Sequence, residues 1–176
     1  METNLWHDIK KDKNSPDIIK VVVETPKDSS NRYEYDTKYN MIKLEKVIYS
    51  TVNCPGDYGF IPRTYGEDST QLDIIVLSSE PSYPGILMRA RPVGLLRMTY
   101  GSMYDDKVVA VPMNDPRYKK VRDRKDLKKH QREELEHFFN VYKHLEGKSV
   151  KIQWRSAATA KKVVERGIRL YDRKFS

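Results

Sequence analysis

The stretch DYGFIPRT (residues 57–64) is followed closely by DSTQLD (residues 68–73). The second run has a carboxylate at each end, Asp68 and Asp73, with neutral residues between them. Residues 72–77 form a short apolar run, which is typical of a strand buried on both faces. The two runs therefore place acidic side chains at the beginning of a buried strand.

The size and composition of the chain suit one compact domain. The 176 residues have a mass of 20.7 kDa, and we expect residues 1–176 to form a single domain. The single cysteine, Cys54, excludes an internal disulfide and favours a reducing compartment. There is no recognisable leader and no run of the roughly 20 apolar residues that a membrane-spanning helix needs. We therefore expect a cytoplasmic protein without a membrane partner.

Apolar patterning predicts strands first and helices last. Residues 135–145 and 160–175 carry apolar side chains at helical spacing, and Gly147 ends the first of these helices. This order predicts an α+β fold built round a small β-barrel. The expected strands are residues 18–24, 32–36, 41–49, 72–77, 85–99 and 107–112.

Positive charge is concentrated in one segment. The formal net charge is +8, and residues 117–132, called the basic segment below, hold nine Lys or Arg against two Asp. Such a segment fits a polyanion, and it equally fits a solvated loop that leads into a helix. The candidate polyanion-binding residues are Arg117, Lys119, Lys120, Arg122, Arg124, Lys125, Lys128 and Lys129.

Short segments along almost the whole chain resemble those of the soluble (family I) inorganic pyrophosphatases, and most closely the short archaeal and bacterial type. The resemblance implies that family's fold, which is an OB-like barrel, closed or partly open, with two C-terminal helices. Besides residues 57–64 and 68–73, the matching segments are NLWHDI (4–9), VETP (23–26), RYEYD (32–36), RARPVGL (89–95), DDKVVAVP (105–112) and HFFNVYK (137–143).

The resemblance also implies hydrolysis of diphosphate on several Mg²⁺ ions. Metals and cationic side chains have to neutralise the charge of diphosphate before hydroxide attacks it. Diphosphate or phosphate is then the ligand, and a homo-oligomer, a trimer or hexamer, is the implied assembly. The implied catalytic residues are Asp68, Asp73, Asp105 and Lys107. The implied metal ligands are Asp68, Asp73, Asp105, Glu24 and Glu34. The implied phosphate ligands are Arg32, Lys46, Tyr58, Lys107, Tyr142 and Lys143.

The sequence departs from the pattern of the family at several positions, and three of these departures affect the chemistry most. Thr70 occupies the position of a carboxylate that orients or deprotonates the attacking water, and a neutral hydroxyl cannot accept that proton. Tyr100 stands in place of a metal-binding Asp, and Cys54 stands in place of a phosphate-binding Tyr. Asp57 or Glu67 could supply a displaced base.

These departures lead to two hypotheses. In the first, diphosphate hydrolysis is impaired or absent, and Mg²⁺ is bound weakly or not at all. The chain then keeps an anion pocket and binds a polyanion, RNA or a ribonucleoprotein, through the basic segment. In the second, the chain is a working Mg²⁺-dependent inorganic diphosphatase with rearranged metal ligands. The missing carboxylates favour the first hypothesis.

Other reactive residues carry weaker signals. Cys54 would need a nearby base to act as a nucleophile, and no histidine is placed by a motif to serve it. His130, His137 and His144 recur every seven residues. They therefore share one helix face, but they are too far apart to hold one metal ion within a chain. We expect them at the surface or at an oligomer interface.

Overall fold

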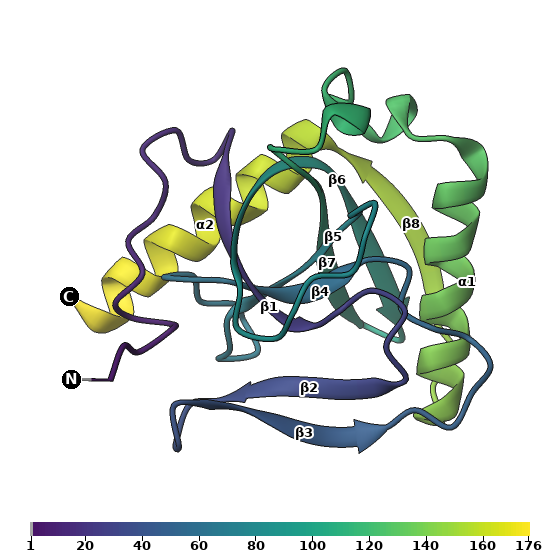
Figure 1. Cartoon of the computed structure of the whole chain (residues 1–176), viewed down its shortest axis with the longest axis horizontal. Coiled ribbons are helices and arrows are strands. Elements are labelled where there is room, and N and C mark those ends of the chain that lie inside the picture. Colours follow the sequence, from purple (N-terminus) through teal and green to yellow (C-terminus); the bar gives the residue numbers. More distant parts are fainter. Residues whose placement is uncertain (1) are drawn as a thin grey trace.

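The structure is a computed structural model that describes residues 2–176. Its core is a closed barrel (Figure 1). Its strands are β1 (Ile19–Thr25), β4 (Asp57–Ile61), β5 (Leu72–Val76), β7 (Met103–Pro112) and β6 (Leu87–Tyr100). They pair in that order, and β6 pairs back to β1, which closes the barrel. The β5–β7 pair is parallel and its neighbours are antiparallel.

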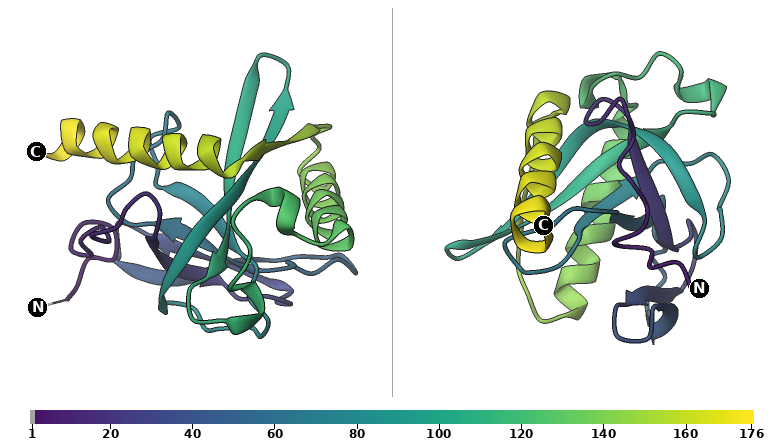
Figure 2. Two further views of the ribbon diagram at one scale, coloured as in Figure 1. Left: turned by 90° about the horizontal axis from the view of Figure 1, so that it is seen from above. Right: turned by 90° about the vertical axis from the view of Figure 1, so that its left-hand side faces the viewer.

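The long strand β6 changes partner along its length. Its first residues pair with β1, and from Gly94 onward it pairs with β8 (Lys151–Ser156). The change follows an irregularity in its ladder with β7 between Pro92 and Gly94. Proline has no N–H to donate, and bulges bend a strand, so this is the expected place for β6 to leave the barrel wall. Beyond it, β6 and β7 extend as a hairpin (Figure 2).

A separate two-stranded hairpin lies beside one end of the barrel. It consists of β2 (Asn31–Asp36) and β3 (Met41–Val47), which pair only with each other among the described residues (Figure 1). Its turn is fixed by Asp36, whose Oδ1 accepts hydrogen bonds from the backbone N–H groups of Lys38 and Tyr39 at 2.9 and 3.1 Å. The β2–β3 hairpin therefore brings a second set of charged side chains toward the barrel.

Two helices flank the barrel, preceded by the short turns η1 (Pro116–Tyr118) and η2 (Arg124–Asp126). Helix α1 (Lys129–Leu145) buries Leu135, Phe138 and Phe139 against the barrel, and Gly147, with φ of 76°, follows its end. Helix α2 (Ala157–Phe175) runs along another side of the barrel (Figure 2). None of the helices in residues 2–176 is long and apolar enough to cross a lipid bilayer.

The beginning and the end of the chain pack against each other. The Trp6 Nε1–H donates to the carbonyl oxygen of Thr64 at 2.9 Å, and the Trp6 ring lies edge-on to Phe175 with centroids 5.3 Å apart. The hydroxyl of Tyr171 lies 2.7 Å from Nδ1 of His7. These contacts fix the N-terminal segment between the loop after β4 and the last turns of α2.

The fold class predicted from the sequence is confirmed, and each expected strand and helix overlaps an observed one. Residues Ile74–Val76 are completely buried, as an apolar run at the centre of a barrel should be. Two observed strands, β4 and β8, were not among the expected ones. Strand β4 is the first half of DYGFIPRT itself, where Gly59 interrupts the apolar pattern.

Candidate active site

A cluster of paired charges lies where β5, β7 and α1 meet. Asp73 is near the beginning of β5, and Asp105 and Lys107 lie two positions apart on β7 and so face the same side. The Lys107 ammonium forms an ion pair with Asp73 and lies 3.1 Å from Oδ1 of Asp105. Lys143, on α1, places its Nζ 3.1 Å from Oδ2 of the same Asp105. We call Asp73, Asp105, Lys107 and Lys143 the charged cluster.

Ion pairing holds Lys107 and Asp105 in their charged forms against the effect of burial. Lys107 is only 6% exposed, and burial alone would lower its pKa. The carboxylates of Asp73 and Asp105 outweigh burial and raise the pKa of Lys107 well above its ordinary value. Burial likewise opposes ionisation of Asp105, but Lys107 and Lys143 lower its pKa below the ordinary value. Lys107 and Asp105 therefore both remain charged near neutral pH.

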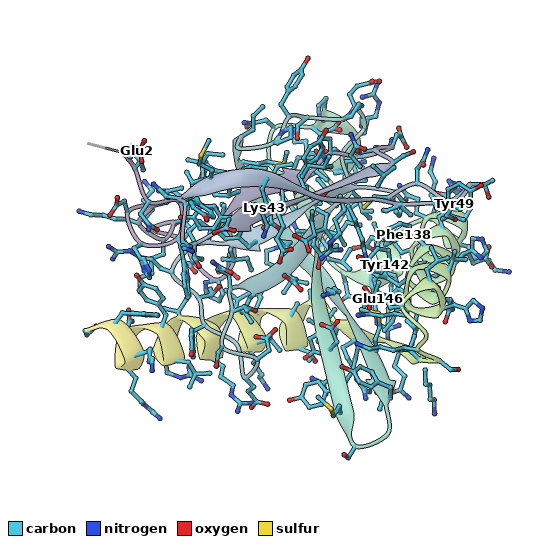
Figure 3. All side chains as sticks on the ribbon, turned by 90° about the horizontal axis from the view of Figure 1, so that it is seen from below. Glu2, Lys43, Tyr49, Phe138, Tyr142 and Glu146 are labelled. Carbon is cyan, nitrogen blue, oxygen red and sulfur yellow. The ribbon has the colours of Figure 1, made fainter. Side chains whose placement is uncertain are left out.

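Aromatic rings hold two further cations beside the charged cluster. The Arg32 guanidinium carbon, from β2, lies 5.5 Å from the ring centre of Tyr58 and 5.2 Å from that of Tyr142. The ammonium of Lys46, from β3, lies 4.9 Å from the Tyr142 ring. Figure 3 shows Tyr142 on α1, on the side that faces the barrel. Cations held over aromatic faces stay in place without losing their charge.

Carboxylates line an open cleft of about 470 Å³ next to this cation group. Glu24 is buried at its wall, where its Oε1 accepts a hydrogen bond from the Tyr35 backbone N–H at 2.8 Å. Burial, and then the charges of Asp73 and Glu34, raise the pKa of Glu24 to about 8. Among the residues that line this cleft, six are Asp or Glu and only two, Arg32 and Lys43, are cationic. The predicted residues along it are Glu24, Arg32, Glu34, Tyr58, Asp68, Thr70 and Asp73.

The donor set in this cleft fits Mg²⁺. Mg²⁺ takes oxygen ligands, keeps several waters and is commonly bound through only one or two carboxylates. Within residues 2–176 no three His, Cys, Asp or Glu side chains converge on one metal position. Burial is the main reason why the pKa of Glu24 is raised, and the charges of Asp73 and Glu34 add to it, so a cation bound in the cleft would favour the charged form of Glu24.

The structure brings the predicted residues together around joined spaces. Asp68 and Asp73 line both the 470 Å³ cleft and a second cleft of about 330 Å³, which also contains Tyr100. A small cavity of about 50 Å³ adjoins them, and it is lined by the predicted phosphate ligands other than Lys46 and by Cys54. Glu146 also lines this cavity and lies 3.6 Å from Lys143. Glu146 was not among the predicted site residues, although its position three residues after Lys143 on a helix could have indicated it.

The three departures have distinct settings. Thr70 is exposed in the loop between β4 and β5, where its backbone N–H donates to Oδ1 of Asp68 at 3.2 Å. Tyr100 ends β6, and its ring lies 5.2 Å from the ammonium of Lys148. Cys54 is buried, and burial raises the pKa of its thiol to about 12. A thiol with that pKa is not a nucleophile near neutral pH.

The two candidate replacement bases are already engaged. Asp57 is fully buried, and its carboxylate accepts hydrogen bonds from Lys27 N–H at 2.9 Å and Ser78 Oγ–H at 2.6 Å. It is not among the residues that line the clefts described above. Glu67 lines the second cleft but forms an ion pair with Arg166 of α2. Asp57 is therefore structural, and Glu67 is held toward α2.

Comparison with known proteins identifies the family. The inorganic pyrophosphatase family model matches residues 21–172. An inorganic pyrophosphatase of Haloferax volcanii is 41% identical over 175 residues, which is 98% of this chain and 99% of the relative. The soluble inorganic pyrophosphatase of Zea mays is 40% identical over 94% of this chain and 78% of the relative. The crystal structure of the Thermus thermophilus inorganic pyrophosphatase superposes with a TM-score of 0.91 at 38% identity, over 97% of this chain and 99% of that one. The chain belongs to the family of soluble inorganic pyrophosphatases, whose cofactor is Mg²⁺.

This result corrects the hypothesis that the sequence favoured. Relatives about 40% identical over nearly the whole chain are named inorganic pyrophosphatases, which supports a working enzyme rather than a pseudoenzyme that binds RNA. The structure gives a physical reason. The paired charges around Lys107 are intact, whereas the basic segment ends at the beginning of α1. Lys129 of the basic segment and Lys143 of the charged cluster are 14 residues apart on α1, which is roughly 21 Å at 1.5 Å per residue. The basic segment is therefore separate from the charged cluster.

Proposed function

We propose that this chain is a working Mg²⁺-dependent inorganic diphosphatase that converts diphosphate and water into two phosphates. The charged cluster carries the proposal, because it keeps two buried ammonium groups in place between the small cavity and the second cleft, which is lined by carboxylates. A protein that only bound an anion would not need so many carboxylates beside its lysines.

The cations and phenols bind the phosphate oxygens in this proposal. Lys107 and Lys143 act as compact point charges, and the planar guanidinium of Arg32 can hold two oxygens at once. Burial raises the pKa of Tyr58 well above the ordinary value, so its hydroxyl remains a hydrogen-bond donor. Lys46 and Tyr142 complete the group from β3 and α1. Together they offset the charge that repels an incoming hydroxide.

The carboxylates would hold the metal. Asp68, Asp73 and Asp105 are the proposed inner ligands, and Glu24 and Glu34 are the proposed outer ones. When bound, Mg²⁺ neutralises phosphate charge and lowers the pKa of coordinated water. Lys107 and Lys143 then keep Asp73 and Asp105 in fixed positions. Two of the carboxylates that would bind Mg²⁺, Asp73 and Asp105, are therefore the ones that pair with the lysines.

A residue other than Thr70 has to take the proton of the attacking water. The Thr70 hydroxyl can donate or accept a hydrogen bond, but it is too weak a base to take a proton from water near neutral pH. We assign this role to Asp68, which lines both clefts and is anchored through Oδ1 by the Thr70 N–H. Its second oxygen is left to face the water.

Phosphate release from diphosphate tests the proposal directly. We expect turnover with Mg²⁺ that stops when a chelator removes the metal. Asp73→Asn should lower kcat by about 10² or more, the usual loss for a group essential to charge stabilisation. Asp172→Asn, an exposed carboxylate on α2, is the matched control and should leave turnover unchanged. Absence of turnover by the native chain with Mg²⁺ would overturn the proposal.

The proposal extends to the form of the protein. We take residues 1–176 as one pyrophosphatase-like domain that works in the cytoplasm, which the buried free thiol of Cys54 supports. We also propose a homo-oligomer, a trimer or hexamer. His130 and His137 line a groove of about 430 Å³ beside α1, which is a suitable place for subunit contact. Light scattering of the purified chain measures the number of subunits, and a monomer at micromolar concentration would contradict the proposed homo-oligomer.

A further inference from the structure

One carboxylate, that of Glu146, lies among three lysines at the end of α1. Its Oε1 lies 3.9 Å from the Nζ of Lys46, which belongs to β3. Its Oε2 lies 3.6 Å from the Nζ of Lys143 on α1 and 4.0 Å from that of Lys148, in the segment before β8. Figure 3 shows Glu146 beyond Tyr142 on the side of the helix that faces the barrel. Glu146 therefore links three separate parts of the chain through one charge.

The position of this carboxylate is unfavourable for the helix itself. Helix α1 ends at Glu146, whose backbone N–H donates to the carbonyl oxygens of Tyr142 and Lys143 at 3.3 and 3.1 Å. The carbonyl groups at the C-terminal end of a helix carry partial negative charge, which attracts a basic side chain and repels an acidic one. The three ammonium groups have to offset this repulsion. A carboxylate that costs its own helix free energy is expected at a functional site rather than at an ordinary surface.

The same side chain reaches the space where phosphate would bind. Glu146 lines the small cavity of about 50 Å³ together with the cations Arg32, Lys107 and Lys143. Within residues 2–176 it is the one carboxylate in the lining of that cavity. Its side chain is 27% exposed, so water and salt screen its charge only in part. A phosphate held by these cations would therefore lie beside a fixed negative charge.

Glu146 balances the charge of the lysines without occupying their hydrogen-bond donors. Its distances to the three Nζ atoms, 3.6 to 4.0 Å, are longer than an ordinary hydrogen bond. A lysine ammonium has three N–H donors, and Lys143 donates only one of them to Asp105, at 3.1 Å. The Lys46 ammonium is kept in place by the Tyr142 ring as well as by Glu146. Both lysines therefore have donors available for phosphate oxygens.

We propose that Glu146 is a positioning residue that also lowers the affinity of the site for its phosphate product. The inference rests on the proposed function, because the same lysines would bind the phosphates. In the empty site the carboxylate balances the charge of the lysines and keeps them beside the cavity. With phosphate bound, the negative charges of the carboxylate and the phosphate repel each other, which favours release of the product.

Calorimetry with inorganic phosphate and Mg²⁺ tests this role. Glu146→Gln keeps the shape of the side chain and removes its charge, so phosphate should bind about tenfold more tightly, which corresponds to ~1.4 kcal/mol. KM for diphosphate should fall as well. Glu146→Asp keeps the charge and should bind phosphate within about twofold of the native value. Glu133→Gln is the matched control, because it removes an exposed carboxylate that pairs with Lys129 at the other end of the same helix, and it should leave phosphate binding unchanged.

The sign of the change separates this role from a purely structural one. If Glu146 only anchored the lysines, its loss would let them move and phosphate would bind more weakly. Weaker or unchanged binding by Glu146→Gln would therefore contradict the inference, and so would absence of phosphate binding by both forms. Failure of the proposed function gives a different pattern. In that case the native chain releases no phosphate from diphosphate, yet Glu146→Gln still binds phosphate about tenfold more tightly.

Discussion

Lys143 Nζ lies 3.1 Å from Oδ2 of Asp105, although the two residues are 38 positions apart in the chain. Lys143 is on α1 and Asp105 is on β7, so this ion pair joins the helix to the barrel at the edge of the candidate active site. Asp105 also binds Lys107, which means that one carboxylate serves two buried ammonium groups. The position of α1 and the charge balance of the site are therefore coupled.

Asp105→Asn should destabilise the fold as well as the chemistry. The substitution leaves the ammoniums of Lys107 and Lys143, which are mostly buried, short of a counter-charge, and removing one partner of such a pair costs up to about 3 kcal/mol. Urea unfolding followed by circular dichroism measures the loss, and phosphate release measures the accompanying fall in kcat. An unchanged urea midpoint would show that the ion pairs add nothing to stability.

Glu24 should make metal-free stability depend on pH. Its pKa is about 8 in the fold, against 4.5 for an ordinary glutamate, so the folded chain binds more protons than the unfolded chain between these values. Stability is therefore lost as pH rises from 4.5 to 8 and stays lost above it. Glu24→Gln removes this dependence, and with a chelator present it should be more stable than the native chain at pH 9, on the order of 3 kcal/mol. Near pH 4 the two should unfold alike. Equal stability at pH 9 would contradict the raised pKa.

Thr70→Ala should retain most of the activity. A neutral hydroxyl is not the proton acceptor, and loss of a true general base costs a factor of roughly 10² to 10⁴. We expect kcat for diphosphate within about fivefold of the native value, measured at saturating Mg²⁺. Asp68→Asn in the same assay should show the large loss. If Thr70→Ala were the more damaging change, the assignment of the proton to Asp68 would be wrong.

Gly59→Ala should weaken the barrel. A Cβ at this position would lie 2.0 Å from the carbonyl oxygen of Val22, which belongs to the neighbouring strand β1. Backbone atoms cannot move aside as a flexible side chain can, so strands β1 and β4 would have to separate. We expect a loss of about 3 kcal/mol, at the upper end for overpacked cores. A thermal unfolding midpoint equal to that of the native chain would rule out this close approach.

Local patterns predicted the parts of the fold that depend on local burial. Residues 72–77 are apolar because both faces of β5 are covered, and α1 shows helical spacing because only one of its faces touches the barrel. Strand β4 escaped prediction because its identity depends on contact with β1 at Gly59, far away in the sequence. Strand β8 is short and half-exposed, so its residues do not show a clear alternation of apolar and polar side chains.

The site was predicted by resemblance rather than by pattern. Nothing in the spacing of Asp73 and Lys107, which are 34 positions apart, shows that they form an ion pair. That pairing depends on the parallel alignment of β5 and β7, which is a tertiary property.

The packing of Trp6 against Phe175 sets the order in which the chain can complete its fold. During synthesis Trp6 is made long before Tyr171 and Phe175, its partner rings on α2. The barrel strands and the hydrogen bond from Trp6 to Thr64 can form before α2 has been made, whereas the contacts of Trp6 with α2 have to wait for that helix. The N-terminal segment therefore reaches its final packing only after α2 has left the ribosome.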